Sequence, residues 1–429
     1  MKQQKGQIIV IFAVALVVLL GFTALAIDGG MVYSDRRFSQ SAADAASLAG
    51  GGAGAATLED EGITYGNFTC TKAGVVSARE DAVDAALARA ATNNILGLDD
   101  DVTDLHGVTT ECVNDKSHFD KHIDIITDVT SETATSFAHL FNGNPLVSQV
   151  EGVVRIRPRT EFAYGYAIVS TNKTACGTND GGVDFTGGGD VHIVGGGIFS
   201  NTCLEKTNAS GSIVVEGGDI GYYDGGPKKP EKFDPAPQDY DAQMPDFQVP
   251  VPVCPGGEHL TQKGGGEIGP GNYDSITMQN GALTMLPGLY CMYGEFKITG
   301  GDLTASGVTI YIVEETGNKT FELGGNGAIN ISAPSDGNEV NGAIPNVLIY
   351  LKDGEDGTVK LTGNTNSFFL GMIYAPDGDI VVSGTNGTHP TFHTQLIGEY
   401  VDVGGTATID INYTSARNLE DRPKLDMLK

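Results

Sequence analysis

An apolar stretch near the N-terminus is the feature that most constrains this chain. Residues Ile8 to Ile27 read IIVIFAVALVVLLGFTALAI, 20 positions without a charged side chain. A helix rises about 1.5 Å per residue, so this stretch matches a hydrocarbon layer of roughly 30 Å. We therefore expect a single membrane anchor helix bounded by Ile8 and Ile27. A cleaved signal peptide is the less favoured alternative, because its apolar region usually covers only about 7–15 residues.

The charges that flank this stretch predict its direction. Lys2 and Lys5 precede it, whereas Asp28 follows it directly. The positive-inside rule then places the N-terminus in the cytoplasm, although Arg36 and Arg37 on the other side weaken the bias. We expect a single-pass protein of the cell membrane, with the bulk of the chain outside the cytoplasm.

The cysteines fit that oxidising compartment. There are six, and sequence proximity suggests three pairs: Cys70 with Cys112, Cys176 with Cys203, and Cys254 with Cys291. Six cysteines allow 15 pairings, and the sequence alone does not choose among them. Since no C-x-x-C motif or compact Cys/His cluster occurs, we expect no zinc site built on them.

The charge of the chain narrows its possible functions, and its glycine content divides it into two parts. The balance of 26 Lys+Arg against 54 Asp+Glu gives a net charge of −28, which argues against nucleic acid as a partner. Of the 60 glycines, 15 lie in residues 1–159 and 45 in residues 160–429. The glycine excess therefore belongs to the second part of the chain.

A sequence motif follows the apolar stretch. Residues 40–50 read QSAADAASLAG, and a Gly6-Gln7 pair opens the stretch itself. This region closely resembles the N-terminal region of TadG-like proteins of Flp (tight adherence) pilus systems. The resemblance implies a membrane-anchored role in pilus assembly or anchoring and in surface adhesion. Prepilins carry a glutamate five residues after the glycine, where this chain has Ile11, so a pilin subunit is not expected.

Small side chains in this motif suggest a contact with small-residue helices of pilus-assembly proteins. The alternative is that the alanines pack on the chain's own domain, because small-residue faces serve both purposes. The partner-binding candidates are Gln40, Ala42, Ala43, Asp44, Ala45, Ala46 and Leu48.

The periodicity of residues 57–160 predicts a small α+β domain after the N-terminal region of residues 1–50. Apolar positions at helical spacing predict a helix over residues 77–95. We expect strands over 102–113, 122–129 and 146–156, and a short helix over 132–141.

Residues 161–415 contain short β-rich runs separated by glycine pairs and triplets. Their spacing of about 8–12 residues is typical of an all-β sandwich, barrel or solenoid. Tight Gly-Gly linkers favour a parallel β-helix over a sandwich built from hairpins. A proline-rich segment, residues 227–255, would strap across the coil or join two sections of it, and 416–429 would form a C-terminal tail. We thus expect a mainly β protein with an α+β N-terminal part.

The sequence gives only weak support for any catalytic or metal-binding residues. The pairs considered are Asp184 with Asp190, Asp377 with Asp379, His389 with His393, and His118 with His122. None comes with a recognisable base, cleft or cationic substrate cluster, and the acidic residues sit in apparent turns. We expect no enzyme, cofactor or metal site. A membrane-anchored or secreted β-helix that binds or cleaves surface carbohydrate is the alternative function.

Overall fold

The structure, a computed structural model, describes residues 7–100, 105–137, 144–174, 182–247, 249–313, 321–338, 340–354, 356–384, 390–414, 420–421 and 423–428. The chain forms two compact units. Unit 1 comprises residues 1–114, 120–159 and 422–429, and unit 2 comprises residues 115–119 and 160–421. Each is described by itself below.

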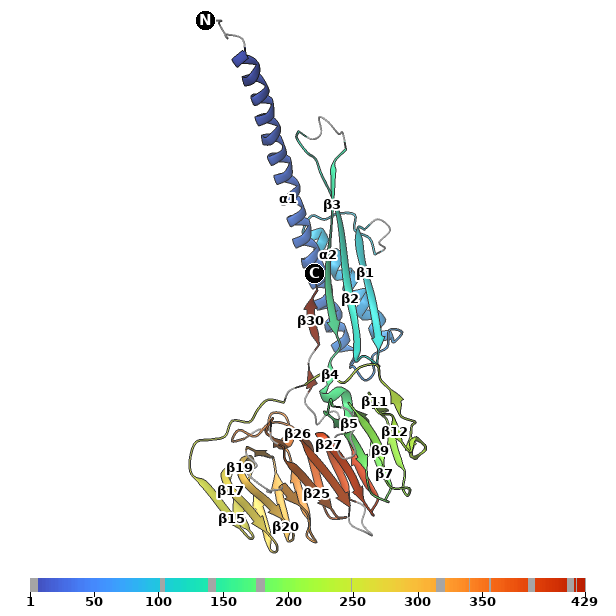
Figure 1. The fold of residues 1–429 in the computed structure, drawn as a ribbon, viewed down its shortest axis with the longest axis vertical. Coiled ribbons are helices and arrows are strands. Elements are labelled where there is room, and N and C mark those ends of the chain that lie inside the picture. The colour runs from blue at the N-terminus through green and yellow to red at the C-terminus, as the bar shows by residue number, and fades with distance from the viewer. Residues whose placement is uncertain are drawn as a thin grey trace. The chain divides into compact units, whose positions relative to one another are not determined.

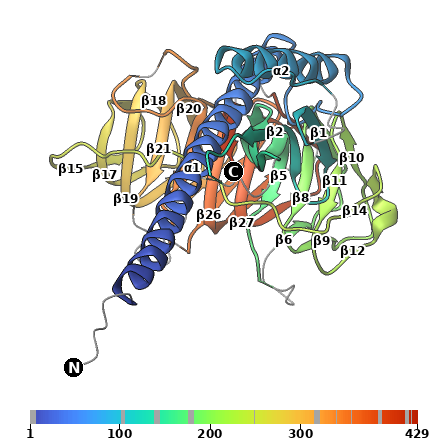
Figure 2. The same cartoon turned by 90° about the horizontal axis from the view of Figure 1, so that it is seen from above.

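In the residues that the structure describes, unit 1 contains two helices and a four-stranded sheet (Figures 1 and 2). Helix α1 spans Gln7–Asp60 without a break, and α2 spans Ala73–Thr92. The sheet has the order β1-β2-β3-β30, with β1 at Gly107–Asp115, β2 at Asp120–Thr133, β3 at Leu146–Arg157 and β30 at Lys424–Met427. Strands β2 and β3 pair antiparallel from Ile123↔Ile156 to Thr133↔Leu146.

Helix α1 ends in a glycine motif that its sequence encodes. Gly62 adopts φ +61°, and the N–H groups of Gly62 and Ile63 donate to the carbonyls of Glu59 and Leu58. Leu58 and Ile63 are both buried, which supplies the apolar contact that accompanies this cap. The long helix thus ends where glycine permits the left-handed turn.

The core of unit 1 lies between the helices and the sheet. Alanines of α1 and α2 face each other there, together with branched residues of β2 and β3. The buried members include Ala43, Ala46, Ala82, Ala86, Ile123, Ile125 and Ile156. Small side chains let the two helices approach each other closely, and the branched strand residues fill the remaining volume.

Unit 2 is built on one large sheet, and the strand pairings described in it are parallel. Its first section holds β5 (Tyr166–Ser170), β6 (Gly182–Phe185), β7 (Val191–Val194), β8 (Gly197–Ser200), β9 (Cys203–Lys206), β10 (Ile213–Glu216), β11 (Ile220–Tyr222), β12 (Pro227–Lys228), β13 (Phe233–Asp234) and β14 (Gln238–Asp239). Each strand pairs with the one three places later, which produces three ladders: β5-β8-β11-β14, β6-β9-β12 and β7-β10-β13.

The second section continues the same three ladders. It contains β15 (His259–Lys263), β16 (Gly266–Ile268), β17 (Gly271–Met278), β18 (Ala282–Met285), β19 (Gly288–Ile298), β20 (Asp302–Ser306), β21 (Val308–Ile312), β22 (Phe321–Leu323), β23 (Ile329–Ser332), β24 (Val347–Leu351), β25 (Thr358–Gly363), β26 (Phe368–Gly384), β27 (Thr391–Gly405) and β28 (Ile409–Asn412). A further antiparallel pair joins β4 (Thr160–Glu161) to β29 (Glu420–Asp421).

The order of these strands in space differs from their order in the sequence. The late strand β27 pairs with the early strands β5 and β6, and β28 pairs with β7. The chain therefore lays down one end of the stack first, crosses to the other end, and winds back onto its first turn. Figure 1 shows this as red strands between green and yellow ones.

The crossing segment lies in the proline-rich stretch and covers one ladder. Tyr240, Met244 and Val249 are buried with Phe199 and Ile397 in one apolar cluster. Strands β5, β8, β21 and β24 have no exposed position as a result. Parallel strands covered on both faces need continuous apolar runs, which explains sequences such as VLIYL in β24.

Glycines form the tight corners between ladders. A Cβ atom on Gly187 would lie 2.2 Å from the carbonyl oxygen of Gly405, and one on Gly189 would lie 1.8 Å from that of Ala407. Any side chain at these corners would push neighbouring turns of the chain apart. At these corners glycine is therefore a packing requirement.

Several expectations need correction. The mainly β prediction is confirmed, and the parallel pairings of unit 2 do not fit the less favoured alternative, a sandwich built from hairpins. The helix over 132–141 is also wrong, because Glu132 and Thr133 belong to β2, whose pairing with β3 outweighs the local preference; residues 138–141 lie outside the described residues. The expected tail contains β30, which pairs with β3 because that edge of the sheet is otherwise open.

Candidate functional site in the anchor helix

The first half of α1 presents apolar side chains outward. Phe12, Leu19 and Leu25 are each exposed by about two thirds of their surface, at 66%, 66% and 71%. Among the described residues, α1 is the one helix long and apolar enough to cross a membrane. A continuous apolar surface of this kind is stable in lipid and not in water, so it has the properties of a membrane anchor.

The second half of α1 packs on the remainder of unit 1. Gly50 and Gly54 face α2, where a Cβ atom would lie 2.6 Å from the carbonyl oxygen of Ala82 and 3.0 Å from that of Ala78. Gly152 of β3 is equally tight, since a Cβ there would lie 2.7 Å from the carbonyl carbon of Ala43. The glycines thus allow backbone-to-backbone approach on two sides of the helix.

This packing divides the expected partner-binding residues. Ala42, Ala43 and Ala46 are 3%, 0% and 0% exposed, so they contact the chain's own core and are not available to a partner. The alternative of packing on the chain's own domain is correct for these three. Asp44 and Ala45 are half-buried, and Leu48 is 48% exposed on the outer face of the helix.

Polar side chains of α1 bind the β2–β3 hairpin at successive turns. The Gln40 Nε2 atom donates to the Glu151 carbonyl oxygen at 2.8 Å and to Asp44 Oδ1 at 2.7 Å. Farther along, the Ser47 hydroxyl donates to the Gly152 carbonyl oxygen at 2.7 Å. Gln40 therefore positions the helix on its own sheet.

Two carboxylates extend this contact toward the apolar first half of α1. Asp35 Oδ2 accepts hydrogen bonds from the hydroxyls of Ser131 and Thr133 at 2.7 and 2.8 Å. Asp28 is 5% exposed and accepts from the backbone N–H groups of Ser136 and Phe137, at 2.8 and 3.1 Å. We call Asp28, Asp35, Gln40 and Ser47 the hairpin clasp.

The sequence signal for the clasp was present but was not used. Asp28 and Asp35 are seven residues apart, which is nearly two helical turns and places both on one face. Gln40 and Ser47 repeat that interval. Asp28 was considered only for its charge beside the span, and the hydrogen-bonding role of this face was missed.

Histidines and carboxylates near the start of β2 form no metal cluster. His118 Nδ1 bonds Asp115 at 2.8 Å, and His122 Nδ1 bonds Asp120 at 2.7 Å. No group of three or more His, Cys, Asp or Glu side chains suited to a metal occurs among the residues that the structure describes. The two histidines also belong to different units.

The acidic pairs of unit 2 act as hydrogen-bond acceptors at its corners. Asp184 accepts from the Thr207 hydroxyl at 2.8 Å, and burial raises the pKa of its carboxyl. Asp190 accepts from the N–H and the hydroxyl of Ser212 at 2.9 Å, which lower its pKa. Asp184 is in β6, whereas Asp190 precedes β7 of another ladder, and each accepts hydrogen bonds from a different residue.

The remaining candidate pairs are Asp377 with Asp379 and His389 with His393. Asp377 accepts from the N–H of Gly354 at 2.6 Å, and burial raises the pKa of Asp379. His389 lies outside the described residues, so its pairing with His393 is not described. Burial lowers the pKa of His393, which favours the neutral imidazole at neutral pH.

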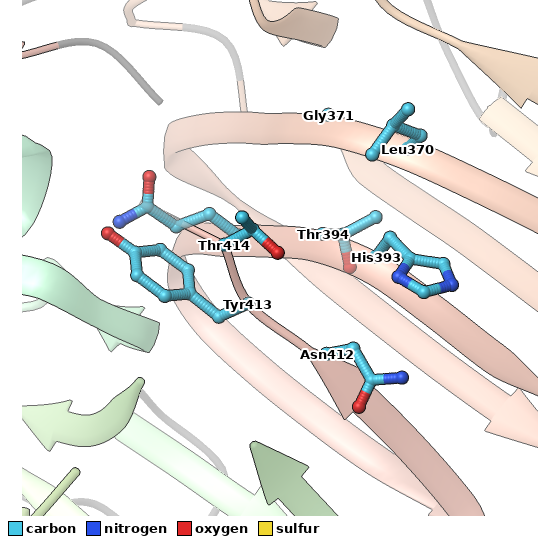
Figure 3. Close-up of a pocket in the computed structure, with 8 residues that line it drawn as sticks. Leu370, Gly371, His393, Thr394, Asn412, Tyr413 and Thr414 are labelled. Carbon is cyan, nitrogen blue, oxygen red and sulfur yellow. The ribbon is translucent and has the colours of Figure 1, made fainter. Parts of the chain in front are cut away.

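A small pocket lies beside His393 (Figure 3). Leu370, Thr394, Asn412 and Tyr413 are among its lining residues, and its volume is about 10 Å³. That is room for about one water molecule. The pocket cannot hold a sugar ring.

Disulfides connect segments within each unit. Cys70–Cys112 links the segment before α2 to β1, and Cys254–Cys291 links the crossing segment to β19. Both pairs were the ones suggested by sequence proximity. Cys203 is also disulfide-bonded, and the expected partner Cys176 lies outside the described residues.

These features define a class: proteins with one N-terminal helix suited to membrane anchoring and a mainly β remainder. The model of the family described as putative Flp pilus-assembly TadE/G-like proteins matches residues 6–56. The N-terminal region is thus similar to that family, which confirms the resemblance drawn from its motif. Neither a curated protein nor a solved structure matches the chain.

Proposed function

We propose that this protein is a membrane-anchored, non-enzymatic component of Flp/Tad pilus assembly or anchoring that also supports surface adhesion. The observation that carries the proposal is the position of the family match in the structure. Residues 6–56 take in almost all of α1, including the apolar stretch and the glycine- and alanine-rich face that packs on unit 1. The matched segment therefore unites a membrane anchor with the helix that organises the domain beside it.

The orientation follows from charge. With the N-terminus in the cytoplasm, both units lie outside, where the Cys70–Cys112 and Cys254–Cys291 disulfides are stable. The net charge of −28 keeps such a domain soluble and repels nucleic acid.

Unit 2 would act as a stiff body. We infer that its three parallel ladders constitute a parallel β-helix whose interior is the continuous apolar cluster that includes Ile168, Ile193, Leu323 and Val382. Backbone groups paired between successive turns make such a stack rigid. A rigid acidic body held by one helix suits a structural component or an adhesive surface.

Absence of catalysis is part of the proposal. Of the carboxylates considered above, Asp184, Asp190 and Asp377 already accept hydrogen bonds within unit 2. Most glycoside hydrolases use two carboxyl groups that flank the scissile bond in one cleft.

Partner contact would use the outward face of α1. Ala42, Ala43 and Ala46 are occupied within unit 1, so a pilus-assembly helix would meet Phe38, Ala45 and Leu48. Phe38 is 51% exposed and Leu48 is 48% exposed, at positions that fall on one face.

The test separates anchoring from partner recognition. Deletion of residues 1–27 leaves the packing half of α1 intact, so we expect a folded protein that no longer sediments with membranes and a cell that lacks Flp pili and adhesion. Replacement of residues 8–27 by an unrelated apolar helix of equal length is the matched control and should restore both. Normal pili and adhesion in the deletion strain would refute the proposal.

A further inference from the structure

We propose that a single water molecule is bound in the small pocket beside His393, where it completes the hydrogen bonding of unit 2 at a break in one of its ladders. The ligand is thus water, held as a structural component between β27 and the end of β28. The residues that form this site all belong to unit 2, so the site is independent of the proposed membrane role.

The break lies along one edge of β27. On this edge β27 pairs with β28 as far as Phe392↔Ile411, and then with β5 from Leu396↔Ile168. Residues 393–395 pair with β26 on the opposite edge, but the described pairings give them no strand partner on this one. Successive residues of a strand direct their backbone N–H and C=O groups to opposite edges, so at least one of the three presents these groups to the break. Buried backbone groups need partners, and here no strand supplies them.

The pocket lies at this break. His393, Thr394 and Gln395 line it from β27, and Asn412 and Tyr413 line it from the end of β28 and the residue that follows (Figure 3). Its volume of about 10 Å³ matches the space that one water molecule needs. None of its described lining residues carries a carboxylate, so the pocket offers no charge to offset that of a cation.

An orphaned hydroxyl indicates that the pocket is occupied. Thr394 is 2% exposed, and its Oγ1 atom is buried without a hydrogen-bond partner. In the view of Figure 3, this oxygen lies on the side of Thr394 nearer Asn412. Thr309, which is 0% exposed, shows the usual arrangement in this unit: its hydroxyl donates to the Val347 carbonyl oxygen and accepts from the Ile344 N–H, both at 2.9 Å. Since a buried hydroxyl without a partner costs free energy, water in the pocket would stabilise Thr394.

The polar groups around the pocket suit water better than an ion. A buried water usually makes about three hydrogen bonds. The Thr394 hydroxyl can donate and accept, and the neutral imidazole of His393 and the amide of Asn412 each offer a donor and an acceptor. A cation could use only the acceptors of this mixed set, and an anion only the donors. Water can use both.

The test detects the water in the full-length protein in detergent. Threonine methyl groups are labelled with ¹³C in a deuterated chain, and the nuclear Overhauser effect from water to each methyl is measured. Thr394→Val and Thr394→Ser both remove the Thr394 methyl signal, so either variant identifies it. We expect a strong cross-peak between water and the Thr394 methyl.

The matched control is the Thr309 methyl in the same sample. Its hydroxyl is equally buried and can also exchange its proton with solvent, but it is bonded to protein groups. Its cross-peak with water should therefore be much weaker than that of Thr394. A Thr394 cross-peak no stronger than that of Thr309 would overturn the proposal.

The stability of Thr394→Val provides a second test, because the sign of the effect depends on the water. Valine keeps the shape of threonine and removes the hydroxyl. If the hydroxyl binds water, a buried hydrogen bond is lost, and the amides of β28 should exchange roughly two- to tenfold faster than in wild type. If the pocket is dry, valine removes an unpaired polar group, and the same amides exchange more slowly. Unchanged or slower exchange would therefore contradict a bound water.

Discussion

Replacing Gly50 by alanine tests whether close helix approach in unit 1 depends on the glycines of α1. Both Gly50 and Gly52 lie inside the same helix, so either substitution gains about 0.5–1 kcal/mol of helix propensity. A Cβ at Gly52 meets nothing within 4 Å, whereas one at Gly50 lies 2.6 Å from the Ala82 carbonyl oxygen and 3.1 Å from Ile125 Cγ2. Overpacking of this kind costs about 1–3 kcal/mol.

The stabilities of the two variants should therefore differ from each other. Gly52→Ala should stabilise unit 1 slightly, and Gly50→Ala should be less stable than Gly52→Ala by about 1–3 kcal/mol. Because 1.4 kcal/mol is a factor of ten, the protected amides of α2 should exchange roughly five- to a hundredfold faster in Gly50→Ala than in Gly52→Ala.

The assay is native-state hydrogen exchange of the full-length protein in detergent, read at the amides of residues 78–90. This readout is local, which matters because a chain of two units does not unfold in one step. Equal protection of these amides in the two variants would refute the argument, since it would mean that the helices accommodate the added methyl group of Gly50→Ala without a loss of free energy.

Two further predictions concern one unit each. Replacing Cys70 and Cys112 by serine removes a crosslink over 42 residues and should lower the free energy of unfolding of unit 1 by about 2–4 kcal/mol. The measurement is hydrogen exchange of the α2 amides during a urea titration, with the Cys254/Cys291 double variant as the control. Equal α2 exchange in the two double variants would contradict the reasoning. Burial raises the pKa of Asp402, so the folded state binds its proton more tightly than the unfolded state, and the stability this contributes is present at low pH and lost as pH rises through the folded pKa. Asp402→Asn keeps the acceptor for the Thr186 hydroxyl and should raise the unfolding temperature of unit 2 at pH 7 but not near pH 3; an equal shift at both pH values would show that ionisation is not the cause.

Local pattern was sufficient for the elements whose partners are close in sequence. Helical spacing of Val83, Ala86, Leu87 and Ala90 predicted a helix over residues 77–95, and the structure places α2 at Ala73–Thr92. The alternation after Leu146 predicted β3. Sequence proximity also predicted the Cys70–Cys112 and Cys254–Cys291 disulfides, because the strands and segments that carry them are connected by short stretches of chain.

Other elements depended on partners distant in the sequence. The expected helix at Glu132 failed because Thr133 pairs with Leu146 of β3, 13 residues farther along the chain, which is beyond the few residues that a helical period compares. β30 is only four residues long and exists because β3 offers an open edge. The packing of Ala43 against Gly152 likewise joins residues that are 109 positions apart.

The sequence by itself determined the apolar anchor-type helix, the mainly β character of the second half and the acidic surface, because these follow from the kind and period of the side chains. Only the tertiary structure decided which face of α1 the chain uses for itself, and that β27 and β28 close onto β5, β6 and β7. The physical reason is that parallel ladders give every turn two equivalent edges. Local pattern cannot say which turn covers which edge, whereas the long crossing segment and the burial of the apolar core select one order.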